Sequence, residues 1–140
     1  MTSSLSLEEM DKYFVLLGCN RLLTGQVAHL RELGYKVIVV AWNEVPAVSG
    51  DIYIRMDVKD SAGIVAELCR RGFYGKVEGA LSSIDLAAPT VNAINRWCGN
   101  AVMPEKFDRV LSKNGMRDSW IAAGLFNRIC WMDSECDIEK

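Results

Sequence analysis

Two short polar segments of this 140-residue sequence carry the residue types that commonly bind small molecules. The first segment is Gly18, Cys19, Asn20 and Arg21, and the second contains Ser82, Ser83 and Asp85. Each follows an apolar run. Backbone N–H groups at the start of a helix attract anions, and an arginine adds a charged hydrogen bond to a carboxylate or phosphate. Serine and aspartate oxygens accept hydrogen bonds from an amine or a hydroxyl. We therefore take these seven residues as candidate substrate-binding residues.

Each segment also has a purely structural interpretation. Gly18 can serve only to make a tight turn, and Asn20 can serve only to cap the helix that follows it. The serines and the aspartate of the second segment are common helix-capping residues as well. The sequence leaves both interpretations open.

Other site chemistries lack their motifs. A dinucleotide site needs the pattern G-x-G-x-x-G, whereas this first loop offers only Gly18 and Gly25, and Glu44 is an isolated acid after the second apolar run. A P-loop also needs Gly-Lys-Ser/Thr, which does not occur. His29 is the only histidine, and the five cysteines are scattered without a C-x-x-C pair. We predict no catalytic residue and no metal ligand in this chain.

Composition narrows the class of protein further. The net charge is −2 and acidic and basic residues are interspersed along the chain, so we expect no nucleic-acid partner. No apolar run approaches the ~18 residues that span a bilayer, and the polar N-terminus is unlike a signal peptide. Scattered, odd-numbered cysteines favour a reduced compartment, and we predict a cytoplasmic protein.

The elements that must position the two polar segments follow from hydrophobic periodicity. Four apolar runs, at 13–18, 36–42, 52–56 and 77–82, are rich in Val and Ile and alternate little, as is typical of strands covered on both faces. Helical spacing separates most of them, and Gly34, Gly72 and Gly99 mark helix ends. We predict an α/β fold with an open parallel sheet of about four strands and helices on both faces. The link at 43–51 is too short for a crossover helix.

The segment after Gly99 predicts two short helices, the second ending near Gly124, and then an extra strand at 129–132. This order resembles the N-terminal, Rossmann-like domain of the ATP-grasp superfamily, which includes carbamoyl phosphate synthetase, biotin carboxylase and the purine carboxylate–amine ligases. In that family a Lys-x-x-Met-Arg…Ala-Gly helix leads out of the first domain, and an Asp-Ser-like turn follows. The matching residues here are Lys113, Met116, Arg117, Ala123, Gly124, Asp133 and Ser134.

The resemblance implies a preATP-grasp domain over residues 12–125, a flexible tail over 1–11, and the start of an ATP-grasp domain over 126–140. It implies a substrate-positioning domain of a ligase that binds a carboxylate or amine substrate. ATP and magnesium are expected in the complete enzyme and not in this chain, which we expect to be inactive without an ATP-grasp domain in cis or in trans. A homodimer is compatible with this reading. The alternative is a stand-alone Rossmann-like nucleotide-binding or regulatory module without catalytic activity.

Overall fold

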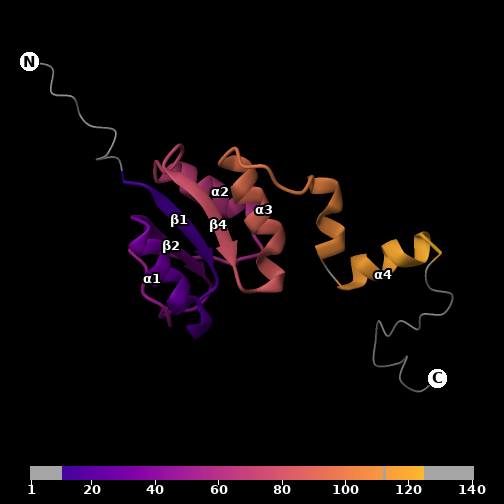
Figure 1. Ribbon diagram of the computed structural model, residues 1–140, viewed down its shortest axis with the longest axis horizontal. Coiled ribbons are helices and arrows are strands. Elements are labelled where there is room, and N and C mark those ends of the chain that lie inside the picture. The colour runs from indigo at the N-terminus through magenta and orange to yellow at the C-terminus, as the bar shows by residue number, and fades with distance from the viewer. Residues whose placement is uncertain (1–10, 112, 125–140) are drawn as a thin grey trace, which may run out of the picture. The chain divides into compact units, whose positions relative to one another are not determined.

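The computed structural model describes residues 11–111 and 113–124 (Figure 1). The chain divides into two compact units, Met1–Asp108 and Arg109–Lys140, which are treated separately below. Residues 1–10 of the predicted tail, the predicted strand at 129–132 and the predicted ATP-grasp start at 126–140 lie outside the described residues.

The first unit contains a four-stranded sheet in which every strand pair is parallel. Its strands are β1 (Tyr13–Leu17), β2 (Lys36–Ala41), β3 (Ile52–Arg55) and β4 (Val77–Ser82). Their order in the sheet is β3-β2-β1-β4. The predicted α/β class and the parallel sheet are therefore confirmed, with strand ends within one residue of the predicted ones.

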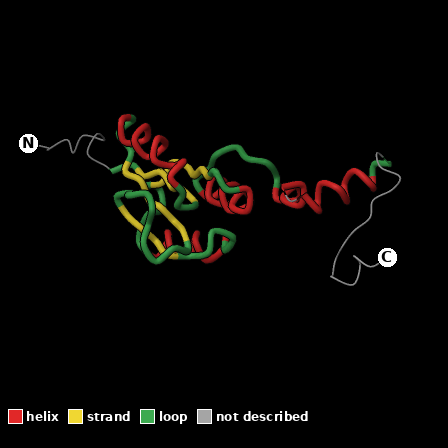
Figure 2. Tube along the Cα trace, turned by 90° about the horizontal axis from the view of Figure 1, so that it is seen from below, coloured by secondary structure: helices red, strands yellow, loops and turns green. Residues whose placement is uncertain are grey.

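Helices cover both faces of this sheet (Figures 1 and 2). They are α1 (Thr24–Glu32), α2 (Ser61–Arg70) and α3 (Ala88–Trp97). Short 3₁₀ turns, η2 (Arg21–Leu23) and η3 (Asp85–Ala87), precede α1 and α3. The connection from β2 to β3 contains no helix, as its length predicts, and it brings the chain to the adjacent strand position. No helix among the described residues has the length and apolar character that crossing a membrane requires.

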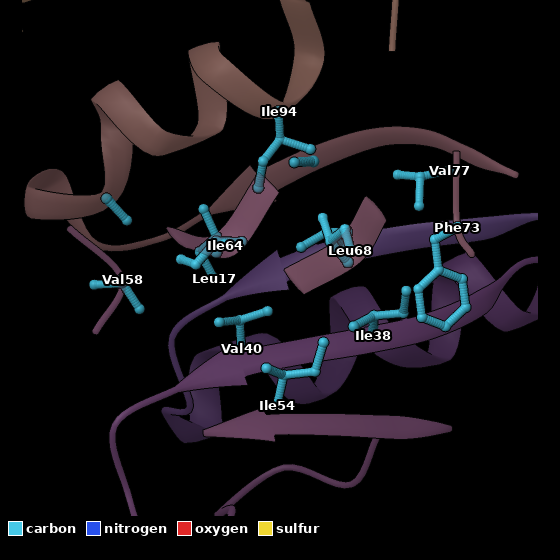
Figure 3. Close-up of a cluster of buried hydrophobic side chains, with 13 residues drawn as sticks. Leu17, Ile38, Val40, Ile54, Val58, Ile64, Leu68, Phe73, Val77 and Ile94 are labelled. Carbon is cyan, nitrogen blue, oxygen red and sulfur yellow. The ribbon is translucent and has the colours of Figure 1, made fainter. Parts of the chain in front are cut away.

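Successive residues of each strand pack into different cores because strand side chains alternate between faces. On one face Leu17, Val40 and Ile54 join Ile64 of α2 and Ile94 of α3 (Figure 3). The other core contains Leu16, Val37 and Val39 of the strands with Val27 and Leu30 of α1. Burial of β1 and β2 on both faces explains why their sequences show no alternation of polar and apolar residues.

One buried polar side chain joins α2 to α3. The Thr90 hydroxyl donates to the carbonyl oxygen of Val58 at 2.6 Å and lies 2.8 Å from the Ser61 hydroxyl. Thr90 is fully buried, so these bonds cannot be replaced by water. The contact fixes the start of α2 against the first turn of α3.

We expect Thr90→Val to lower the free energy of unfolding by about 1–3 kcal/mol, because it leaves the buried Val58 carbonyl without a donor. Urea denaturation followed by circular dichroism measures the change. Thr90→Ser keeps the hydroxyl and is the matched control, expected to lose less. Equal losses for both variants would mean that packing, and not the hydrogen bond, sets the effect.

A carboxylate near the end of α2 is held by two guanidinium groups. Glu67 accepts hydrogen bonds from Arg70 at 2.6 and 2.9 Å and from Arg71 at 2.7 Å. These charged donors lower the pKa of Glu67 from its usual 4.5 to about 2. Both arginines lie close to the last carbonyls of the helix, where positive charge is favourable.

This arrangement predicts a pH dependence of stability. Since the folded-state pKa lies below the unfolded-state value, the contribution of Glu67 is fully present above about pH 4.5 and is lost as the pH falls towards about 2. The unfolding free energies of wild type and Glu67→Gln should therefore differ near neutral pH and converge in acid. Glu105→Gln, at an exposed position, is the control. A difference that persists in strong acid would contradict the assignment.

The second unit contains one described α-helix, α4 (Lys113–Ala122), which follows the 3₁₀ segment η4 (Glu105–Leu111) across the unit boundary. The helix passes through Asn114-Gly115 without a break and ends at Ala122, two residues before Gly124, whose φ is +73°. Two predicted helices are thus present, although the first has 3₁₀ and not α geometry.

Candidate functional site

The two polar segments meet at the carboxyl edge of the sheet. β1 and β4 are neighbours, but the chain leaves β1 towards β2 on the other side, so the strand order reverses between them. Open α/β sheets bind ligands at such a switch point. The structure therefore brings the residues after β1 and the residues after β4 to one place, as their positions after parallel strands predict.

Close backbone packing ties these two loops together. Gly18 has a φ of +103°, and a Cβ atom added to it would lie 2.3 Å from the Cδ1 atom of Ile84. Ser82 donates from its hydroxyl to the Leu17 carbonyl at 2.6 Å and accepts the Ile84 N–H at 3.0 Å. Both hydrogen-bonding roles of Ser82 are thus used within the protein. Gly18 and Ser82 shape the site and hold its two loops in register.

Asn20 and Ser83 form the second link between the loops. The Asn20 side-chain amide donates to the Ser83 hydroxyl at 3.2 Å, a contact between residues 63 positions apart. Asn20 occupies the N-cap position of η2, yet its side chain makes no capping hydrogen bond. Its Oδ1 atom is buried and has no hydrogen-bond partner among the described residues. The capping interpretation of Asn20 is therefore wrong, and the side chain faces the other loop.

Two charged residues flank this link. Arg21 follows Asn20 and is exposed, and Asp85 lies two residues after Ser83 and is exposed too. In the part of the chain that the structure describes, neither charge is in an ion pair. Water satisfies an exposed charge, so the missing ion pairs do not by themselves indicate a ligand, but both side chains are accessible to one.

Cys19 has a different role from its neighbours. Its sulfur accepts the backbone N–H groups of Ala47 and Val48, which belong to the connection after β2. Tyr53 supports the same connection by donating its hydroxyl to the carbonyls of Ala41 and Asn43. Burial, and to a lesser degree the Cys19 thiol, raises the pKa of the Tyr53 hydroxyl, so that it remains a donor. Cys19 therefore joins the loop after β1 to the loop after β2.

Sequence reasoning missed a group of exposed apolar residues at this same edge. They lie in the segments that follow β1, β2 and β4: Leu22, Trp42, Val45 and Leu86, with exposed fractions between 50% and 79%. Periodicity identifies buried apolar residues, but it gives no signal for apolar side chains in loops. No group of three side chains suited to holding a metal ion occurs among the described residues.

The parallel order and the helices on both faces define an open, Rossmann-like α/β fold, and its polar switch point is the candidate site. No family model and no curated protein matches the sequence. Solved structures do match, and the three described below are ATP-grasp ligases. The resemblance of this chain to the N-terminal domain of those enzymes is therefore confirmed at the level of the fold.

Three of these structures show the extent of the likeness. Phosphoribosylglycinamide synthetase from Anaerococcus prevotii matches 81% of this chain with a TM-score of 0.62 and 16% identity. L-amino acid ligase from Bacillus licheniformis matches 86% with a TM-score of 0.55 and 17% identity. N5-carboxyaminoimidazole synthetase from Staphylococcus aureus, solved with ADP, matches 81% with a TM-score of 0.51 and 12% identity. The chain covers only 29%, 32% and 30% of these proteins, respectively.

Proposed function

We propose that this chain is the substrate-positioning N-terminal domain of an ATP-dependent carboxylate–amine ligase. The observation that carries the proposal is the fold match, which includes more than four fifths of this chain but less than one third of each ligase. A domain of this kind contributes to catalysis by holding one reactant in place for the other. Its candidate substrate contacts are the residues at the switch point.

In this proposal, the phosphoryl chemistry belongs to the ATP-grasp domains, which act in cis or in trans. ATP with magnesium would activate a carboxylate there as an acyl phosphate, and an amine would displace the phosphate. Arg21 and Asp85 would orient the acceptor through charged hydrogen bonds. The chain alone is expected to bind Mg-ATP poorly, and calorimetry that shows tight binding to it would contradict this division of roles.

The exposed apolar residues at the carboxyl edge support a partner domain on the same side as the candidate site. Leu22, Val45 and Leu86 are each at least 63% exposed, and Trp42 is half-exposed. Exposed apolar groups around a polar site are typical of surfaces that other protein parts cover. An ATP-grasp domain seated there would also exclude water from a reactive acyl phosphate.

A kinetic experiment tests the positioning role. In a complex or a longer polypeptide that contains this chain and an ATP-grasp domain, Arg21→Ala with Asp85→Ala should raise the KM for the acceptor ~10-fold or more, since each charged hydrogen bond is worth ~1.5–3 kcal/mol. The KM for ATP should not change. Lys76→Ala, at the amino end of β4, is the control. A changed KM for ATP with an unchanged KM for the acceptor would refute the proposal.

A further inference from the structure

The two outer strands of the sheet, β3 and β4, differ in how their free edges are covered. Side-chain amides from Asn95 and Asn100 bind the free edge of β4, at the backbone of Ala80 and Glu78. Among the described residues, no such hydrogen bond covers the free edge of β3. An open strand edge is a template for pairing with a further strand. The edge of β3 is therefore a candidate interaction surface.

The backbone groups that face outward from β3 belong to Tyr53 and Arg55. The N–H and C=O of one residue point to the same side of a strand, and this side alternates from each residue to the next. Met56 donates its N–H to the Ala41 carbonyl of β2 at 2.9 Å. By alternation, Ile54 also faces β2, whereas Tyr53 and Arg55 face away from it. Burial agrees with this assignment, because Ile54 is 2% exposed and Arg55 is exposed.

The outward groups of β3 are complementary to themselves under a two-fold rotation. If two copies of β3 run antiparallel with the axis beside Ile54, Tyr53 of each copy lies opposite the partner's Arg55. Residues opposed in this way exchange both of their N–H···O=C bonds, so every outward N–H and C=O of both residues is used. An axis beside Tyr53 would instead set Arg55 against the partner's Asp51, whose N–H already donates to the Val37 carbonyl.

The charges on the edge favour the same register. Asp51, Tyr53 and Arg55 lie on one face of β3, because side chains alternate between faces. In the antiparallel pair, the partner's Arg55 lies opposite Tyr53 and diagonal to Asp51, a separation that a long side chain can span. The side chains of Asp51 and Arg55 are 34% and 60% exposed, so both are accessible from the edge. The two-fold axis forms this pair of opposite charges twice.

Two further charges near the edge are compatible with this pairing. Glu44 lies 3.7 Å from Arg55 within one copy and is 82% exposed, so Arg55 can interact with Glu44 and with the partner's Asp51 together. Asp57 lies beyond the end of β3, where its carboxylate accepts the Lys59 N–H in a turn. The strand pairing therefore ends at Arg55.

We infer that two copies of this chain associate by antiparallel pairing of their β3 strands, which joins their sheets into one continuous sheet. The occupant of the open edge is thus a second copy, oriented by the opposite charges of Asp51 and the partner's Arg55. β2 and β1 separate β3 from β4, so the pairing uses a different edge of the sheet from the β1–β4 switch point. The inference does not rest on the proposed function.

Hydrogen exchange on the whole chain tests both the association and its location. Sedimentation velocity at rising concentration is expected to show a monomer–dimer equilibrium. Amide exchange of Tyr53 and Arg55, followed by NMR, should slow ~10-fold or more at concentrations where the dimer predominates, because exchange then requires the paired strands to separate. The N–H of Ile54 faces β2 in either state and is the internal reference, expected to change little.

A proline at an outward position tests the hydrogen bonds across the edge. Arg55→Pro removes one of the two bonds in each opposed pair, at a position where an edge strand accepts proline because the N–H points outward. It should raise the Kd of the dimer ~10-fold or more. Arg55→Ala keeps the N–H but removes the charge, and as the matched control it should raise the Kd less. Should Arg55→Pro fail to fold, the exchange experiment on the wild-type chain still decides.

Three results would overturn the inference. One is a chain that stays monomeric at every concentration reached. Another is slow exchange of Tyr53 and Arg55 that does not depend on concentration, which would mean that a segment of the same chain covers the edge. The third is a dimer in which these two amides exchange as fast as in the monomer, since its interface would lie elsewhere. Failure of the proposed function would appear separately, in the kinetic experiment on Arg21 and Asp85.

Discussion

Gly18→Ala is expected to lower the free energy of unfolding by about 2–4 kcal/mol and to disrupt the candidate site. An L-residue at a φ of +103° is strained by about 1–2 kcal/mol, and the new Cβ would overlap the Cδ1 atom of Ile84 at 2.3 Å. Relief of this overlap requires Ile84 to turn away from Gly18. Since Ile84 follows Ser83 directly, its movement should also weaken the link between Asn20 and Ser83.

Two other glycines separate the causes of this effect. Gly34 has a φ of +91° but open space around its Cα, so Gly34→Ala reports the backbone strain alone. Gly25 lies in α1 with open space and no positive φ, and Gly25→Ala should stabilise the chain by about 0.5–1 kcal/mol. Urea denaturation gives the three values. A loss for Gly18→Ala no larger than that for Gly34→Ala would mean that Ile84 adapts without cost.

The sheet could be predicted from the sequence because its strands are buried on both faces. In β2, residues Val37 to Val40 are fully buried, and such a run has no other stable environment in a small α/β domain. The helix ends could also be predicted from their glycines, and Gly34, Gly72 and Gly99 all have the positive φ that is typical of such positions. The order of the strands in the sheet could not be predicted from burial patterns, because it depends on which strands pair.

The candidate site was predictable only in part. The rule that ligands bind at the carboxyl ends of parallel strands correctly placed the residues after β1 near those after β4. It did not distinguish Ser82, whose hydroxyl ties β4 to β1, from Ser83, which holds Asn20. That distinction arises from the direction of each side chain at the end of β4, which neighbouring serines in a sequence do not reveal. The contact of Cys19 with the loop after β2 is similarly long-range.

The outer edge of β4 shows another feature that periodicity could not reveal. Among the described strands, β4 has a neighbour, β1, on one side only. On its free side, the Asn95 side chain of α3 accepts the Ala80 N–H and donates to the Ala80 carbonyl, both at 2.9 Å. Asn100 donates to the Glu78 carbonyl at 2.8 Å. The two amides bind the edge as the peptide groups of a fifth strand would, and Gly79 permits the close approach of Asn95.

Asn95→Ala is therefore expected to lower the free energy of unfolding by about 2–4 kcal/mol, because a buried N–H and a buried carbonyl of Ala80 lose their partners. An open strand edge also pairs readily with another chain. We expect the variant to associate with increasing concentration, as measured by sedimentation velocity, while the wild-type β4 edge stays closed.

Asn92→Ala on the same helix is the matched control for this prediction. It makes the same change at a partly buried position whose side chain forms no hydrogen bond with the described residues, so its effect should be small. Asn95→Asp refines the argument, since it keeps an acceptor for the Ala80 N–H but sets a carboxylate oxygen against the Ala80 carbonyl, and it should lose stability as well. If Asn95→Ala were as stable as Asn92→Ala, water would be an adequate partner for the β4 edge, and α3 would be held on the sheet without the Asn95 hydrogen bonds, by contacts that include the packing of Ile94.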